Sequence, residues 1–352
     1  MKSKSSECSK GGVFNCAKIR GCSGTCVISG DPHYTTFDKR HIYVEGSCFY
    51  TMVATKPSIT GNQVLKIWVQ NTHCMKSNDA YCTKSLSLQF GDTDNSTFIQ
   101  LVTTKNILVN KIPNRLPLQI NDPLRLTIQE VAHDTVLIES YNGIRILWHQ
   151  KTQIEITLPE FYQDQVQGLC GNYNGNSEDD ATKSSGELTT NDNELAVSWA
   201  TAECKSTLSL SYLGVCAKSY EYEKFAKEFC QRLLYEPFNS CHMSVDPNPF
   251  IQQCEHDICL CGGNEKDNCA CESMASYGRA CMKNGLTLKW RSSSLCGNPI
   301  DPKCPNGMEY MECKNLCSVS CFSLTQTNCS TECIDGCQCK SVWNYLDCSS
   351  ET

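Results

Sequence analysis

The sequence predicts a multi-domain chain: an antiparallel β-sandwich, then a small disulfide-rich α-helical module, then a disulfide-rich loop module. Three observations lead to this fold class. The chain has 28 cysteines in 352 residues, a content typical of disulfide scaffolds. A long stretch with few cysteines has the residue pattern of β-strands, and the stretch after it has helical periodicity.

Cysteine density marks the predicted domain boundaries. Three cysteines lie in a short strip at 1–22, six in 23–204, ten in 212–297 and nine in 304–352. The second segment must fold mainly through a hydrophobic core, whereas the last cannot bury one and must be held by disulfides. Its odd number of cysteines fits a partner beyond Thr352. We therefore expect this module to be truncated and the chain to be part of a longer protein.

The predicted strands are runs of β-branched and aromatic residues at 42–52, 65–69, 98–102 and 124–128. The clearest hairpin joins 135–139 to 144–148. Its Asn142-Gly143 pair predicts a type I′ turn, which needs two positive φ angles. Many strands without helices between them favour an antiparallel sandwich.

Three helices are predicted in the third segment. Aromatic and aliphatic residues recur at helical spacing from Tyr220 to Leu233. Pro247 and Pro249 suit the start of a second helix that runs toward Cys259. A third should begin near 268 and end at the Asn284-Gly285 pair, which is a plausible C-cap.

The cysteines are expected to form disulfides and not zinc sites. Their spacing is irregular, with CxC pairs at 259/261, 269/271 and 337/339, whereas zinc clusters use matched CxxC pairs. Disulfides imply a secreted, extracellular protein. No signal peptide follows the basic residues 1–4, and no apolar run reaches the roughly 20 residues that span a bilayer. A net charge of -7 without a basic block excludes nucleic acid and anionic membrane as partners.

The segment 168–180 has the composition of a cation-binding loop. Asn172, Asn174 and Asn176 alternate, so their amide oxygens can converge, and Asp179 and Asp180 add negative charge. Gly171 and Gly175 permit a tight path. Calcium takes 6–8 hard oxygen ligands in such loops. Because the spacing is not that of an EF-hand, a plain Asn-Gly turn with solvated acids is the alternative.

Two motifs together carry a family resemblance. The first is Cys-Val-Ile-Ser-Gly-Asp-Pro-His-Tyr-Thr-Thr-Phe-Asp at 26–38, and the second is Gly-Leu-Cys-Gly-Asn-Tyr-Asn-Gly at 168–175. They resemble the two ends of the von Willebrand factor D domain. The cysteines of 216–296, with Trp290-Arg291, are similar to the eight-cysteine module that follows D domains. Residues 304–339 resemble a trypsin-inhibitor-like module, and 8–22 resemble the strip that precedes some D domains.

This resemblance implies a D assembly like those of gel-forming mucins, von Willebrand factor, zonadhesin-like and tectorin-like proteins. The expected role is that of a calcium-binding structural and assembly module in a secreted mucin-like or extracellular-matrix glycoprotein. Expected partners are other D assemblies, through self-association, or extracellular glycoproteins. The family's Ca²⁺ ligands correspond here to Asp38, Asn172, Asn174, Asn176, Asp179 and Asp180.

The resemblance also implies disulfide pairs: Cys26–Cys170, Cys48–Cys204 and, locally, Cys74–Cys82. Two further cysteines, Cys230 and Cys271, match positions that link chains in the family's multimers, although pairing inside the chain is the favoured interpretation. Many members have Cys-Gly-Leu-Cys where this chain has Gln167 to Cys170. Without the second thiol of a CxxC pair, we expect no isomerase-like activity.

Covalent processing is predicted at two kinds of site. Asn95 and Asn328 are in glycosylation sequons. Some proteins with a Gly-Asp-Pro-His motif cleave their own Asp-Pro bond. The resemblance extends this possibility to the bond between Asp31 and Pro32, with His33 as a proton relay. The alternative is that Asp31 and Pro32 only form a turn.

The leading rival function is protease inhibition through residues 304–352, where Lys314 and Lys340 are candidate specificity residues. A hydrolase is not expected, because the sequence has neither Gly-x-Ser-x-Gly nor His-Glu-x-x-His. The sequence therefore predicts a protein that is not an enzyme.

Overall fold

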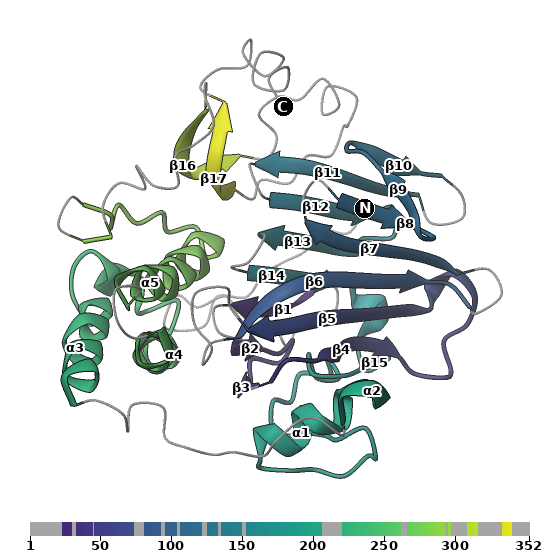
Figure 1. Cartoon of the computed structure of the whole chain (residues 1–352), viewed down its shortest axis with the longest axis horizontal. Coiled ribbons are helices and arrows are strands. Elements are labelled where there is room, and N and C mark those ends of the chain that lie inside the picture. The colour runs from purple at the N-terminus through teal and green to yellow at the C-terminus, as the bar shows by residue number, and fades with distance from the viewer. Residues whose placement is uncertain are drawn as a thin grey trace, which may run out of the picture. The chain divides into compact units, whose positions relative to one another are not determined.

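A computed structural model gives the structure of the chain (Figure 1). It describes residues 23–29, 33–44, 46–73, 81–92, 96–103, 106–121, 125–132, 135–149, 153–205, 220–261, 266–292, 295–296, 308–315 and 333–339. The chain divides into two compact units. The first comprises Met1–Gln129 and Val136–Lys218, and the second comprises Glu130–Thr135 and Ser219–Thr352.

The first unit contains two antiparallel sheets, as the β-sandwich prediction requires. One has eight strands in the order β10-β11-β12-β13-β14-β1-β2-β3, and the other has seven in the order β15-β4-β5-β6-β7-β8-β9. The strands of the first sheet are β1 Gly24–Ser29, β2 His33–Thr35, β3 His41–Tyr43, β10 Leu118–Ile120, β11 Leu126–Ala132, β12 Thr135–Ser140, β13 Arg145–His149 and β14 Gln153–Leu158. Those of the second are β4 Phe49–Thr55, β5 Leu65–His73, β6 Tyr81–Phe90, β7 Thr97–Thr103, β8 Asn106–Val109, β9 Ile112–Asn114 and β15 Val166–Gln167.

The core of this unit is built from alternating strand residues. Ile154, Ile156 and Leu158 of β14 are fully buried, as are Leu65 and Ile67 of β5. This period of two places one face of each strand toward the other sheet. Each fully buried aliphatic side chain contributes roughly 1.5–3 kcal/mol.

Two local predictions for this unit were wrong. The run 42–52 is split into β3 and β4, with 44–48 between them. The 140–144 turn is also not type I′, because Gly143 has a positive φ of 91° and Asn142 does not. The N–H of Gly143 donates to the carbonyl of Ser140 at 3.0 Å, and Ser140 N–H bonds Ile144 O. These bonds indicate a type I turn with a left-handed glycine, the three-residue hairpin loop.

The first unit also contains short helices, and these were not predicted from the sequence. They are α1 Asp192–Trp199, α2 Ala202–Lys205, η2 Gly61–Gln63 and η4 Glu160–Tyr162. Asn191 caps α1, since its side chain accepts from the N–H groups of Asn193 and Glu194 at 2.9 and 3.2 Å.

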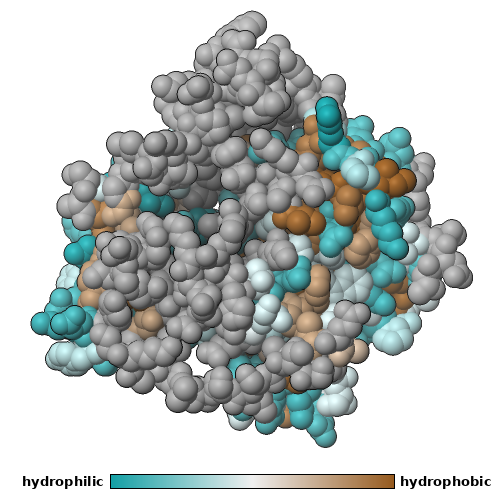
Figure 2. Space-filling model, viewed as in Figure 1, coloured by the Kyte–Doolittle hydropathy of each residue, from teal (hydrophilic) through white to brown (hydrophobic). Residues whose placement is uncertain are grey.

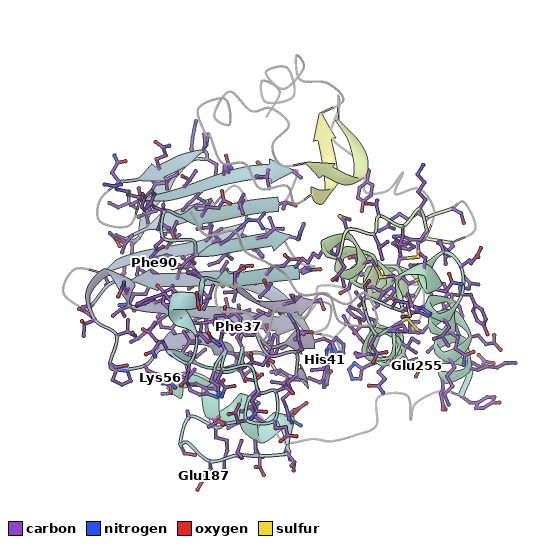
Figure 3. All side chains as sticks on the ribbon, turned by 180° about the vertical axis from the view of Figure 1, so that it is seen from behind. Phe37, His41, Lys56, Phe90, Glu187 and Glu255 are labelled. Carbon is purple, nitrogen blue, oxygen red and sulfur yellow. A yellow bond between two sulfur atoms is a disulfide. The ribbon has the colours of Figure 1, made fainter. Side chains whose placement is uncertain are left out.

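The helices of the second unit agree with the prediction in place and order. They are α3 Tyr220–Cys230, η6 Gln231–Leu234, η7 Phe238–Cys241, α4 Asn248–Cys261 and α5 Lys266–Lys283. Gly285, with φ 81°, follows α5 and its N–H bonds Met282 O, so the predicted C-cap is confirmed. Disulfides are visible among these helices (Figure 3). The described part of 304–352 is an antiparallel pair of strands, β16 Met308–Asn315 and β17 Cys333–Cys339.

Apolar side chains appear among hydrophilic ones on the surface (Figure 2). Large exposed ones in the first unit include Ile112 of β9, Tyr141 of the turn after β12 and Phe161 of η4. Scattered exposure of this kind is ordinary for a folded domain. Among the described residues, no helix is long and apolar enough to cross a membrane.

Candidate metal centre

The loop predicted to bind calcium is anchored at its start to β4. The N–H groups of Leu169 and Cys170 bond the carbonyls of Thr51 and Met52, both at 3.0 Å. Cys170 also forms a disulfide with Cys26 of β1. Both sheets therefore hold the residue from which the loop departs.

Gly171 is required by the path of the loop. Its φ is +80°, and a Cβ at this position would lie 2.0 Å from Oδ1 of Asp180. The Asp180 carboxylate is buried and accepts hydrogen bonds from the hydroxyl of Thr36 and from the N–H of Asn172 at 3.2 Å. A side chain at 171 would displace this carboxylate.

The three asparagines form a ladder of turns. Oδ1 of Asn172 accepts from the N–H of Asn174 at 3.0 Å, and Oδ1 of Asn174 accepts from Asn176 N–H at 2.8 Å. Oδ1 of Asn176 accepts from Glu178 N–H at 3.2 Å. The amide oxygens thus shape the loop through Asx-turns. Each keeps a second lone pair for another donor or a cation.

Asp38 reaches the ladder from a distant part of the sequence, and Asp179 reaches it from within the loop. The two oxygens of Asp38 accept from the N–H groups of Asn174 and Gly175, both at 2.9 Å. The oxygens of Asp179 accept from the side-chain amides of Asn172 and Asn174 at 3.1 and 2.8 Å. The structure therefore brings the predicted residues Asp38, Asn172, Asn174, Asn176, Asp179 and Asp180 into one hydrogen-bonded cluster.

The charged forms of the carboxylates in this cluster are disfavoured by burial and by their mutual repulsion. Burial raises the pKa of Asp38 above its ordinary value, and the charge of Asp179 adds to this effect, although hydrogen bonds from Gly175 and Asn174 oppose it. Burial also raises the pKa of Asp180 to about 6, with repulsion from Asp38 and Asp179 adding to it. A cation close to these groups would favour their charged forms.

The donor set fits calcium. Carboxylate and amide oxygens are the hard ligands that Ca²⁺ prefers, and their number allows the usual six to eight. The oxygens of the three carboxylates do not all lie within 4.8 Å of one another. The amide oxygens between them would therefore have to complete the coordination.

Residues 26–187 match the model of the von Willebrand factor type D domain family, and residues 229–297 match that of the C8 domain. The chain contains a von Willebrand factor type D domain and a C8 domain. The D domain match begins at Cys26 and includes the whole candidate loop. The C8 match contains α4 and α5.

Several long proteins share this D and C8 region. Von Willebrand factor of Bos taurus is 27% identical over 321 residues, which cover 90% of this chain and 33% of that protein. Human IgGFc-binding protein is 30% identical over 348 residues and human Mucin-5B 29% over 339, each covering 94% of this chain. The chain spans only 6% of either of these two. The chain thus carries a von Willebrand factor type D and C8 region of a secreted, extracellular protein.

The structure forms the two long disulfides that the resemblance implies for the D domain, Cys26–Cys170 and Cys48–Cys204. The predicted local pair lies outside the described residues, because Cys74 and the side chain of Cys82 are not described.

Two C8 cysteines that match the family's interchain positions are paired within the chain in this structure. Cys230 pairs with Cys254, 24 residues away, and Cys271 pairs with Cys296, 25 residues away. These pairs follow the intrachain interpretation, and a link to a second chain stays a prediction.

Other predicted positions lie mostly outside the described residues: Asp31, Pro32, Asn95 and Asn328. His33 begins β2, with its ring 5.1 Å from that of Tyr43.

The sequence reasoning missed two residues that build the centre. Thr36 bonds Asp180, and Tyr173, with φ 58°, places its ring 5.4 Å from that of Phe37, which Figure 3 labels. Both residues lie inside the two motifs that carry the family resemblance, and their place in those motifs was the signal that could have identified them.

Proposed function

We propose that this chain is a calcium-binding, disulfide-stabilised module that supports assembly of a secreted mucin-like or extracellular-matrix glycoprotein. The observation that carries the proposal is the meeting of Asp38 with the loop 172–180 beside the Cys26–Cys170 disulfide. Asp38 and Asn174 are 136 residues apart in sequence. The cluster thus joins the two ends of the D domain.

In this proposal, the carboxylates of Asp38, Asp179 and Asp180 hold the ion, with amide oxygens of the asparagine ladder. Bound Ca²⁺ supplies the positive charge that three neighbouring carboxylates need. The backbone N–H groups of Asn174 and Gly175 orient Asp38, and Thr36 orients Asp180. The chain's own hydrogen bonds therefore preorganise the ligands.

A site of this kind has a structural consequence. A ligand that binds only the folded state stabilises it by roughly 2.7 kcal/mol at a hundredfold excess over its dissociation constant. Here that stabilisation would act where β1, β4 and the loop are already joined. The D domain would then remain folded as a rigid unit of a long extracellular chain.

The proposed partners are other D assemblies, through self-association, or extracellular glycoproteins. Support comes from relatives named as mucins and von Willebrand factor, in which the same region recurs. These relatives are structural and adhesive glycoproteins, so we infer a role that is not enzymatic. Cys230 and Cys271 pair within the chain, so the self-association proposed here does not require a covalent link at those positions.

The inhibitor alternative has no support from the described residues. Lys314 lies in β16, where its backbone pairs with Ile334 of β17, and not in the exposed loop that inhibition requires. Lys340 lies outside the described residues. Protease inhibition therefore stays a prediction.

Thermal melting of the secreted chain, with calcium or with EGTA, tests the proposal. Wild type should melt at a lower temperature in EGTA, and Asp179→Ala should remove that difference. Glu178→Ala is a matched control, because it deletes the same charge from an exposed position next to Asp179. Equal melting of wild type in calcium and EGTA would sink the calcium proposal.

A further inference from the structure

The tripeptide Tyr-Asn-Gly occurs twice in the sequence, at 141–143 in the hairpin turn after β12 and at 173–175 in the loop 168–180. Because glycine has no Cβ, its backbone nitrogen can approach the side-chain carbonyl carbon of the asparagine before it. Ring closure between these two atoms expels ammonia and converts the asparagine to aspartate or isoaspartate. Since both copies have the same three residues, their surroundings in the fold determine which one reacts faster.

In the hairpin turn, the nucleophile bonds a neutral group. The N–H of Gly143 donates to the backbone carbonyl of Ser140 at 3.0 Å. This oxygen is a poor proton acceptor, so it holds the N–H without activating it. The hydroxyl of Ser140 donates to Oδ1 of Asn142 and polarises that side chain. In the Asn-Gly pair after α5, the N–H of Gly285 likewise donates to a carbonyl, that of Met282 at 2.9 Å.

In the loop, the nucleophile bonds a carboxylate. The N–H of Gly175 donates to Oδ1 of Asp38 at 2.9 Å. The other oxygen of Asp38 accepts from the N–H of Asn174 at 2.9 Å, which fixes the carboxylate in this position. A carboxylate within hydrogen-bond reach of the proton that it removes has the geometry of a general base. Gly175 is also exposed, so water reaches the reacting atoms.

The side chain of Asn174 is held at both of its polar atoms. Its Oδ1 accepts from the N–H of Asn176 at 2.8 Å, in an Asx-turn that folds the side chain toward the backbone after it. The same N–H stabilises the negative charge that develops on Oδ1 when Cγ is attacked, as an oxyanion-hole donor does. The leaving amide, at Nδ2, donates to Asp179 at 2.8 Å. Electrophile, nucleophile and base are therefore held together before the reaction begins.

We propose that Asn174 is a site of self-catalysed deamidation, with Asp38 as the general base. The nitrogen of Gly175 bonds to Cγ of Asn174, and its proton passes to Asp38. The bond from Cγ to Nδ2 then breaks, and Nδ2 takes the proton and leaves as ammonia. Water opens the succinimide ring that remains, which gives aspartate or isoaspartate at position 174. The reaction needs no calcium, so the inference does not depend on the calcium proposal.

The modification changes the loop irreversibly. In either product, a carboxylate replaces the amide that donates to Asp179, and the two like charges repel each other. Isoaspartate also lengthens the backbone by one methylene, which shifts the N–H groups that Asp38 accepts from. The modified loop therefore loses contacts that hold it in place, and the modified fraction grows with the age of the secreted chain.

Peptide mass spectrometry tests the inference on the full folded chain, incubated with a chelator at neutral pH in water labelled with heavy oxygen. The label marks residues that convert during the incubation. Asn174 should convert about tenfold or more faster than Asn142, a modest effect for a general base. In the reduced chain in urea, the two rates should become similar, because the tripeptide is the same. A preference for Asn174 that persists in urea would come from sequence alone and would overturn the proposal.

Asp38→Asn removes the base but keeps an oxygen that can accept from Gly175. It should slow the conversion of Asn174 about tenfold or more and leave that of Asn142 unchanged. Glu178→Ala, which deletes an exposed charge of the same loop, is the matched control and should change neither rate. The comparison of the two asparagines in wild type carries the test if Asp38→Asn unfolds the loop. Equal conversion of both asparagines in folded wild type, or conversion of Asn174 at the wild-type rate in folded Asp38→Asn, overturns the proposal.

Discussion

Replacing Gly171 with alanine should damage the D domain far more than the same change at Gly175. Both glycines have left-handed φ angles, +80° and +90°, so an alanine is strained at either position. This backbone strain costs about 1–2 kcal/mol. At 171, the added Cβ would also stand 2.0 Å from Oδ1 of Asp180, whereas nothing lies within 4 Å at 175.

The displaced carboxylate determines the size of the difference. Asp180 is buried and would lose the hydrogen bonds from Thr36 and Asn172. A hydrogen bond to a charged group contributes about 1.5–3 kcal/mol, so the loss of both bonds together with the strain should cost about 4–8 kcal/mol in Gly171→Ala. Gly175→Ala should cost only the strain.

Hydrogen exchange of the full chain, with disulfides intact and calcium present, measures the loss. Amides of β1 and β14 report opening of the sandwich without requiring the whole chain to unfold in one step. Gly171→Ala should reduce their protection much more than Gly175→Ala. Equal effects of the two substitutions would refute the placement of Asp180 against Gly171.

Three further outcomes are expected. Tyr34→Phe should lower the free energy of unfolding by about 1–3 kcal/mol, because it leaves the buried side-chain amide of Asn71 without the Tyr34 hydroxyl to which it donates at 2.9 Å. In thermal melts, the control Tyr141→Phe, at an exposed site, should cause no comparable loss. Burial raises the pKa of Asp192, so the free-energy cost of its buried charge is absent below about pH 4 and grows as the pH rises through the raised pKa. Asp192→Asn should have the melting temperature of wild type at low pH and a higher one at pH 7. A lower melting temperature of the variant at pH 7 would contradict this. Graded reductant should expose the modules after residue 216 to proteolysis first, since each lost disulfide of a small domain costs roughly 2–5 kcal/mol, and early cuts within 40–160 would contradict that order.

The sequence predicted the sandwich and the three C8 helices because their signals are local. Alternating strand residues and the Asn284-Gly285 cap act over a few positions. The helix α1 also had a local signal, with Asn191 at the N-cap and Glu194 three residues later. It was missed because a run of predicted strands led us to expect a sandwich without helices.

The detailed chemistry of the loop could not be predicted in the same way. Alternating asparagines suggested converging amide oxygens, yet each oxygen bonds the N–H two residues later. Such turns compete with metal ligation for the same oxygens, and spacing alone does not decide between them. The bond from Thr36 to Asp180 spans 144 residues and depends on the tertiary fold. Only the family resemblance placed Asp38 at this loop.

Calorimetric titration of the chelator-treated chain with calcium tests the central claim most directly. Wild type should show saturable binding. Asp38→Ala should abolish it, because Asp38 meets the loop from the other end of the D domain. Glu178→Ala should bind as wild type does. Calcium binding by Asp38→Ala equal to that of wild type, or no binding by wild type, would contradict the account.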